Sequence, residues 1–214
     1  GKTLFEWSMI SLSGYANDVD RYIFIAMRDS ENDVEKFIKE KCEKLNINQY
    51  NIILLDYLTD GQATTAMLAS KYWNLEHALL IYNIDTYVEA GEMNSEQLKG
   101  DGFIPCFHAE GNHWSFVRLG EDDKAVEIKE KVRISDNCTL GAYYFNTCKL
   151  YKELYNEFYS NPDVLKEIVN GEKYVAPLYN YLLSKNGSIY ICDINPQKVH
   201  VLGTPDELKA FINE

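Results

Sequence analysis

The chain has 214 residues, of which 46% are hydrophobic, and a formal net charge of −12. This length suits one sizeable α/β domain, and no apolar run approaches the roughly 20 residues that span a bilayer. An acidic surface repels phosphates, which argues against a nucleic-acid partner. The opening GKTLFEWSM lacks the basic start and the apolar core of a signal peptide. We therefore expect a soluble, cytoplasmic protein without membrane insertion.

The first half of the sequence alternates apolar runs with amphipathic segments. The runs predict buried strands at 21–27, 51–58 and 78–85. The segments between them, 31–45 and 62–73, predict helices. Strands that are apolar on both faces and alternate with helices are typical of a parallel sheet covered on two sides. The sequence therefore predicts an α/β fold, a three-layer αβα sandwich with a mostly parallel central sheet.

The second half is richer in turns and predicts β-hairpins. Helices are expected from about 146 to 169 and around 176–183, and Thr204-Pro205-Asp206-Glu207 has the pattern of a capped helix start. No repeat or linker divides the chain, so one domain over 1–214 is the simplest interpretation. The strand-like segments are GFIPCFHA, HWSFVRLG, AVEIKEK, LGAYYF, SIYICDI and KVHVLG.

The five cysteines are scattered and never spaced as CxxC, which argues against a disulfide framework and a structural zinc site. We expect most of them to be reduced thiols in the core. A metal cluster of Cys106, His108 and His113 is the alternative, although their spacing fits no zinc pattern.

The apolar run ALLIYNID delivers a carboxylate, Asp85, at its end. The carboxyl ends of the strands in an open α/β sheet form the edge where ligands bind. A buried strand would hold Asp85 rigidly at that edge. The alternative is that Asp85 caps a turn or the following helix, and position alone does not separate the two.

Five motifs occur along the chain in a fixed order: TDGQATTAM, LLIYNIDTYV, the hairpin WSFVRL with VEIKEK, LGAYYF, and LGTPDEL. Together they resemble sugar-phosphate nucleotidyltransferases, the nucleotide-sugar pyrophosphorylase-like enzymes of bacterial surface and capsular polysaccharide pathways. The resemblance extends over the whole of 1–214. No single motif is highly specific, whereas five in the right order are.

The resemblance implies roles for particular residues. Gly61 and Gln62 match the loop that contacts the nucleotide base, and Asp85 matches the carboxylate that holds Mg²⁺ against the nucleotide phosphates. Glu130 and Lys131 match a Glu-Lys pair that reaches the sugar phosphate. In LGAYYF, Gly141 matches a glycine that lets the backbone approach the sugar.

The implied reaction joins a sugar 1-phosphate to a nucleoside triphosphate and releases pyrophosphate. Asp85, through Mg²⁺, and Lys131 would carry the catalysis, because two anions must be aligned and neutralised. UTP, CTP or dTTP is expected from the resemblance, while the sugar and the oligomeric state stay open. The rings of Trp114, Tyr143 and Tyr144 either stack on a sugar or, more simply, pack in the core.

Each implied role has a structural alternative. Gly61 can serve as a strand-to-helix turn, and Gly141 as a β-bulge. Glu130 and Lys131 can form an exposed charged pair on a hairpin. The ordered resemblance is what favours the functional interpretation over these three.

The sequence departs from the family pattern at two places. The family's first strand and its glycine-rich phosphate loop have no counterpart, so we expect that 1–214 is a single domain lacking this element. Val201 stands where many relatives have a second metal-binding aspartate, and Asp193 and Asp206 are candidate replacements.

Two other functions compete with nucleotidyl transfer. A glycosyltransferase of the related fold would use a metal-binding aspartate at the same strand end. Its usual signature is two aspartates separated by one residue, whereas this chain has Asp85-Thr86-Tyr87. The absent loop and Val201 also fit a non-catalytic nucleotide-binding domain.

Overall fold

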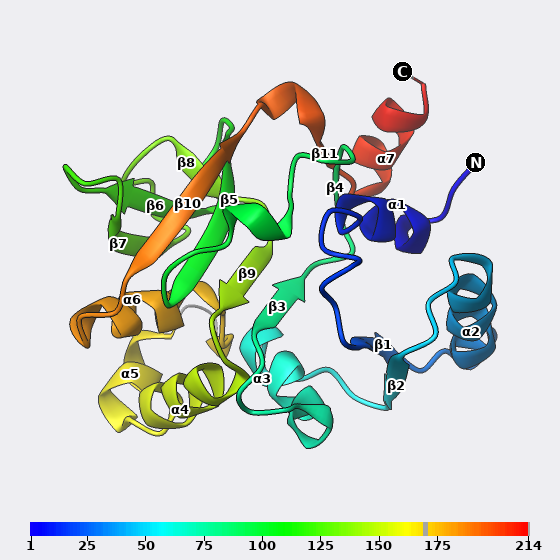
Figure 1. Ribbon diagram of the computed structural model, residues 1–214, viewed down its shortest axis with the longest axis horizontal. Helices are drawn as coiled ribbons and strands as arrows, with labels where there is room; N and C mark the ends of the chain where they lie inside the picture. Colours follow the sequence, from blue (N-terminus) through cyan, green and yellow to red (C-terminus); the bar gives the residue numbers. More distant parts are fainter. Residues whose placement is uncertain (169–170, 214) are drawn as a thin grey trace.

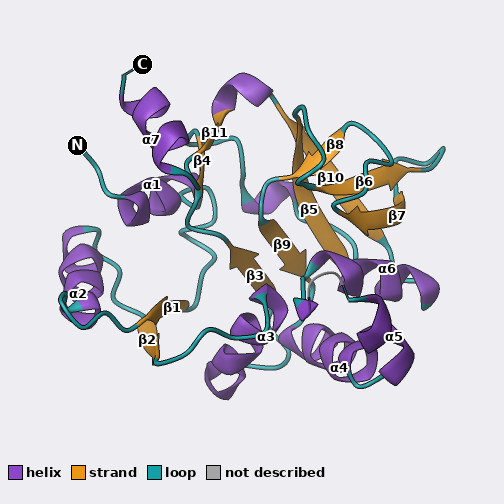
Figure 2. Ribbon diagram, turned by 180° about the vertical axis from the view of Figure 1, so that it is seen from behind, coloured by secondary structure: helices purple, strands orange, loops and turns teal. Residues whose placement is uncertain are grey.

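The computed structural model describes residues 1–168 and 171–213, and a seven-stranded sheet lies at its centre (Figures 1 and 2). The strand order is β3-β9-β5-β8-β6-β7, and β10 pairs with the other edge of β5. The strands are β3 (Leu79–Tyr82), β5 (Gly102–His108), β6 (Ser115–Leu119), β7 (Ala125–Glu130), β8 (Asn137–Thr139), β9 (Ala142–Phe145) and β10 (Ile189–Ile194).

The prediction of an α/β fold is confirmed, but the prediction of a mostly parallel central sheet is wrong. In this sheet only β10 and β5 run parallel among the described strands, and the other pairings are antiparallel. One cause is β9, from the LGAYYF motif, which enters between β3 and β5 and runs against both. The other is the hairpin-rich second half, in which β8 pairs with β5 and β6, and β6 with β7, all antiparallel. A local apolar pattern does not encode the insertion of β9, because the pairing joins segments far apart in sequence.

Two small sheets flank the central one. The first pairs β1 (Tyr22–Met27) with β2 (Tyr50–Leu55) in parallel, so the predicted strands at 21–27 and 51–58 are confirmed. The second pairs β4 (Thr86–Val88) with β11 (Val199–Val201) in antiparallel. Figure 1 shows the first of these sheets, with α2, on the side of the molecule opposite to α4, α5 and α6.

The expected helix over 146–169 is divided in two. Asn161 caps a new helix at Pro162, because proline lacks the backbone N–H and disfavours helical conformation in the residue before it. Positions 169 and 170 lie outside the described residues. The helices are α1 (Leu4–Ser11), α2 (Val34–Lys44), α3 (Gln62–Met67), α4 (Cys148–Tyr159), α5 (Pro162–Glu167), α6 (Ala176–Ser184) and α7 (Pro205–Ile212), and the 3₁₀ turns are η1 (Leu68–Tyr72), η2 (Ser95–Gln97) and η4 (Pro196–Lys198).

Aromatic side chains hold α4 and α6 against the central sheet. The rings of Phe145 and Tyr179 stack with centroids 4.4 Å apart, and the Tyr179 hydroxyl donates to the Tyr144 carbonyl oxygen. Tyr151 is fully buried, and its hydroxyl donates to the carbonyl oxygen of Ala63 at 2.8 Å. These bonds let tyrosine fill the core without leaving its hydroxyl unpaired, and they connect the core directly to α3.

The five cysteines are free thiols, four of them buried, as the sequence predicts. Cys106 is buried whereas His108 and His113 are exposed, so the alternative of a cluster formed by these three side chains is not supported. Within 1–168 and 171–213, no group of three or more potential ligand side chains is placed to hold a metal ion. None of the helices in these two ranges combines the length and the apolar composition that crossing a bilayer requires.

A cavity of about 1090 Å³ lies between the small parallel sheet and the central sheet. Tyr22–Ala26 of β1 line one side, Leu79–Tyr82 of β3 line the other, and α1 contributes Phe5 and Met9. In the part of the chain that is described, β1 pairs only with β2, and β3 only with β9. The side chains of β1 and β3 are therefore mostly half-buried, although both strands are apolar on both faces.

A buried carboxylate joins α1 to α2 beside this cavity. Glu6 is 5% exposed, and its oxygens accept hydrogen bonds from Lys44 at 2.7 Å, Lys41 at 3.0 Å and the Thr3 backbone at 2.9 Å. These bonds, that from Lys44 foremost, hold the pKa of Glu6 well below its usual range.

We expect Glu6→Gln to lower the free energy of unfolding by about 3 kcal/mol at pH 7, because it leaves two lysines without their buried partner. The folded-state pKa is lowered, so this stabilisation is present above the ordinary value of 4.5 and is lost as the pH falls below it. Urea titrations at pH 7 and at pH 3 to 4 should show the gap between wild type and variant closing. The exposed pair Glu35–Lys39 provides the control, since Glu35→Gln should leave the free energy of unfolding nearly unchanged.

Candidate functional site

The loop before α3 depends on a very close contact between two backbone segments. Gly61, the residue before α3, has φ +132° and ψ 173°, a region that is essentially restricted to glycine. A Cβ atom at Gly61 would lie 2.4 Å from the carbonyl oxygen of Lys173. The Lys173 N–H donates to the Asp60 carbonyl oxygen at 2.6 Å, and the Lys173 carbonyl accepts from Ala63 at 2.9 Å. Gly61 is therefore enclosed between its own loop and the backbone of Lys173.

Side chains reinforce this enclosure. The Lys173 ammonium lies 2.7 Å from the Asp60 carboxylate, and the Thr64 hydroxyl donates to the same carboxylate. The Lys173 side chain is only one-fifth exposed and lies near the rings of Tyr155 and Tyr159. The Gly61–Gln62 loop is therefore held in one conformation before any ligand binds.

Gln62 and Gly141 meet at a residue that the sequence analysis did not single out. The Gln62 amide donates to the Asn83 side chain at 2.5 Å, and the Asn83 N–H donates to the Gly141 carbonyl at 3.1 Å. Gly141 has φ +84°, and a Cβ atom there would lie 2.9 Å from the Asn83 amide nitrogen. The structure thus brings the first and fourth motifs together. The one available signal was that Asn83 lies two residues before Asp85 in the second motif.

Asp85 lies in the turn between β3 and β4, next to the last motif. Its carbonyl oxygen accepts from the Leu202 N–H at 2.8 Å. A Cβ atom at Gly203 would lie 3.5 Å from the Asp85 carboxylate and 3.8 Å from that of Glu207. The Asp85 carboxylate retains solvent access, yet the groups around it raise its pKa, mainly by desolvation and also through the charge of Glu207.

Glu207, rather than either expected replacement, is the acid beside Asp85. The exposed Asp206 lies 3.6 Å from Lys209, and Asp193 on β10 lies 3.8 Å from His108. The Glu207 carboxylate also accepts from the Thr204 N–H at 2.8 Å, so it is fixed by the predicted helix cap. The capping pattern was visible in the sequence, but its proximity to Asp85 was not.

Glu130 and Lys131 follow different paths from the end of β7. The Glu130 carboxylate accepts a hydrogen bond from the Ser115 hydroxyl, and burial raises its pKa. Lys131 has φ +55°, and its ammonium donates to the Tyr174 hydroxyl at 2.6 Å while lying 4.6 Å from the centre of that ring. Neither residue behaves as an unconstrained surface charge, although the lysine is exposed.

The candidate sugar-stacking rings are mainly structural. Tyr143 is 5% exposed and shares a hydrogen bond with Thr139, and Trp114 packs edge-on against Phe107. Tyr144 is half-buried and lines the cavity beside β3.

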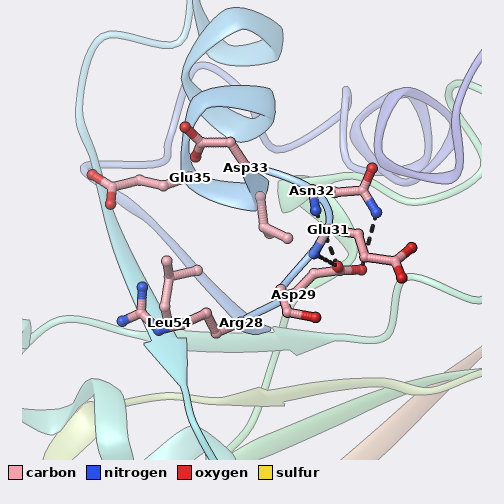
Figure 3. A pocket seen from close by; sticks show the side chains of 9 residues that line it. Arg28, Asp29, Glu31, Asn32, Asp33, Glu35 and Leu54 are labelled. Atoms are coloured by element: carbon pink, nitrogen blue, oxygen red, sulfur yellow. Dashed lines mark hydrogen bonds between the residues drawn. The ribbon is translucent and has the colours of Figure 1, made fainter.

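A separate cavity of about 310 Å³ lies where β1 and β2 end, and Figure 3 shows its lining. Its wall is a tight loop in which the Asp29 carboxylate accepts from the backbone of Glu31 at 2.7 Å and Asn32 at 3.1 Å. Arg28 is paired with Asp56 at 2.7 Å. None of the site residues expected from the sequence lines this cavity, and the side chains of Arg28 and Asp29 already have partners.

Three solved structures illustrate what the chain is similar to. A nucleoside-diphosphate-sugar pyrophosphorylase from Vibrio cholerae RC9 is 32% identical over 100% of this chain and 88% of its own, with a TM-score of 0.89. The inositol-1-phosphate CTP transferase from T. maritima is 14% identical over 98% and 80%, with a TM-score of 0.71. The CTP:phosphocholine cytidylyltransferase from Streptococcus pneumoniae is 14% identical over 99% and 85%, with a TM-score of 0.68. No family profile and no curated protein sequence matches the chain.

We expect Gly61→Ala to lower the free energy of unfolding by about 3 kcal/mol or more, because the added methyl group combines a forbidden conformation with a clash against Lys173. Gly91→Ala is the matched control, since Gly91 also has positive φ but nothing within 4 Å of its added Cβ. Strain alone should cost the control ~1–2 kcal/mol. Urea denaturation followed by circular dichroism measures both, and equal losses would show that the contact with Lys173 is not tight.

Proposed function

Because the chain belongs to the sugar-phosphate nucleotidyltransferase family, we propose that it joins a sugar 1-phosphate, or a similar small phosphorylated group, to a nucleoside triphosphate for surface polysaccharide biosynthesis. An oxygen of the acceptor phosphate attacks the α-phosphorus of the triphosphate. The bond from the α-phosphorus to the bridging oxygen breaks as the new P–O bond forms, and pyrophosphate leaves.

One observation carries this proposal: four family motifs that are far apart in sequence meet around the segment from Asn83 to Asp85. Gln62 and Gly141 contact Asn83, and the final motif contacts Asp85 through Leu202. A rigid Gly61–Gln62 loop for the base, and the Asp85 carboxylate two residues beyond the Asn83 that this loop contacts, suit a nucleotide whose base and phosphates bind side by side. Lys131 directly follows β7, and its ammonium group, bonded to Tyr174, is suited to bind the phosphate of the acceptor.

The surroundings of Asp85 fit a magnesium ion. Among residues 1–168 and 171–213, no cationic side chain forms an ion pair with Asp85, and Glu207 adds a second negative charge nearby. Mg²⁺ binds with one or two carboxylates together with phosphate and water oxygens, so Asp85 alone can be a sufficient protein ligand. When bound, the ion would offset the charge of the triphosphate. Asp85 would hold it, and the capped start of α7 would fix Glu207 beside it.

The names of the similar proteins indicate the chemical class of the acceptor. The names of two similar proteins specify inositol 1-phosphate and phosphocholine, each a phosphate monoester on a small polar group. The name of the third specifies a nucleoside-diphosphate sugar, for which the corresponding monoester is a sugar 1-phosphate. A panel of these phosphates with UTP, CTP and dTTP therefore spans the proposed chemistry.

We expect Asp85→Asn to reduce pyrophosphate release by at least 100-fold in the presence of Mg²⁺, because the phosphates lose the group that orients their counter-ion. Asp193→Asn is the control, a carboxylate at a strand end that faces His108 instead. It should keep the wild-type rate, and circular dichroism should show both variants folded.

Three results would contradict the proposal in different ways. Full turnover by Asp85→Asn would remove the metal role. Sugar transfer from a nucleotide sugar without pyrophosphate formation would indicate a glycosyltransferase. Nucleotide binding without turnover of any acceptor in the panel would indicate a binding domain.

We propose further that one more strand occupies the cavity between β1 and β3 and completes a three-layer αβα sandwich. Among the described residues, β1 and β3 line the two sides of the cavity and each pairs with one strand, although both are apolar on both faces. This arrangement supports the proposal. A central strand inserted there would satisfy the backbone groups of both edges.

The intact mass of the protein from its natural source tests the additional strand. We expect it to exceed the mass of the 214 residues by that of roughly two dozen residues, the length of one strand and its connection. A mass equal to that of the 214 residues would contradict the proposal.

A further inference from the structure

The segment Glu172–Tyr174 contacts both halves of the proposed site, and none of the five motifs includes it. On one side the backbone of Lys173 encloses Gly61. On the other side the hydroxyl of Tyr174 accepts the hydrogen bond from Lys131. Neighbouring residues of one segment therefore hold the nucleotide loop and the acceptor lysine in a fixed relation.

Tyr174 is itself fixed from three directions. Its hydroxyl donates to the Glu172 carboxylate while accepting from Lys131, and its carbonyl oxygen accepts from the Tyr159 hydroxyl. Tyr159 is the last residue of α4, is 7% exposed and packs in the hydrophobic core. The backbone of Tyr174 is thus anchored to the packed core, while its hydroxyl is bonded to the two exposed side chains of Glu172 and Lys131.

The chemistry of this contact leaves the lysine usable. In the described parts of the chain Lys131 forms no ion pair with a carboxylate, and Glu130 is bonded to Ser115 instead. A neutral phenol can orient an ammonium group without cancelling its charge, whereas a carboxylate would compete with a phosphate for it. A lysine side chain otherwise loses considerable rotamer entropy when a ligand fixes it.

We infer that Tyr174 is a positioning residue, which holds the ammonium group of Lys131 ready for the acceptor phosphate. The inference rests on the proposed function for its kinetic consequence but not for the contact itself. It explains why an exposed lysine in left-handed backbone conformation has a defined side-chain position.

The test compares Tyr174→Phe with Tyr181→Phe. Tyr181 is a matched control outside the site, because its ring also lies beneath a lysine, Lys185, at 5.0 Å and its hydroxyl also donates to a glutamate, Glu157. We expect Tyr174→Phe to raise KM for the acceptor phosphate about tenfold, with the Kd of the nucleotide unchanged. Tyr181→Phe should change neither value.

A double variant separates positioning from general loss of structure. If Tyr174 acts through Lys131, then adding Tyr174→Phe to Lys131→Met should cause no further change in KM. A further tenfold rise in the double variant would overturn the inference.

Chemical labelling tests the contact without turnover. The rate at which acetic anhydride modifies Lys131, followed by mass spectrometry, should rise several-fold in Tyr174→Phe while that of the exposed Lys36 stays constant. An unchanged rate would overturn the inference even in an active enzyme. A raised rate in a protein that turns over no acceptor would leave the contact established and the proposed function refuted.

Discussion

The close approach of the Lys173 backbone to Gly61 is the constraint on which the arrangement of the site depends. Any side chain at position 61 would separate the two segments, and with them Asp60, Ala63 and the start of α3. The same approach places Tyr174 against Lys131 from the next residue along. Two clusters that the sequence associates with different substrates thus share one short piece of backbone, so neither can shift alone.

The charged side chains of the candidate site differ in whether they have a partner. Lys173 neutralises Asp60 within the loop, and Lys131 is held by a neutral phenol. Asp85 and Glu207, by contrast, lie together with no cation paired to Asp85 among the described residues. Like charges close together are unfavourable unless a cation accompanies them, and this pair of carboxylates is therefore consistent with the magnesium ion proposed above.

The sequence predicted local structure well and tertiary pairing poorly, for a physical reason. The strands at 21–27 and 51–58 and the capping box at Thr204 depend on neighbouring residues, and they are confirmed. The prediction of a mostly parallel sheet was wrong, in part because β9 pairs in antiparallel with β3 and β5, which are distant from it in the chain. Asn83, Tyr174 and Glu207 were missed because what distinguishes each is a partner on another element. The residues taken from the family resemblance lie where those partners are.

In the described part of the chain, β1 and β3 each have one edge without a neighbouring strand. Their sequences, YIFIAM and LLIY, contain none of the charges or prolines that usually protect an edge strand. Apolar residues on both faces are selected where both faces are covered, as in the interior of a sheet. The strands β1 and β3 therefore have the composition of interior strands, although each lies at the edge of its sheet among the described residues. Since β3 leads directly into Asn83 and Asp85, whatever pairs with its free edge also determines how firmly the centre of the site is held.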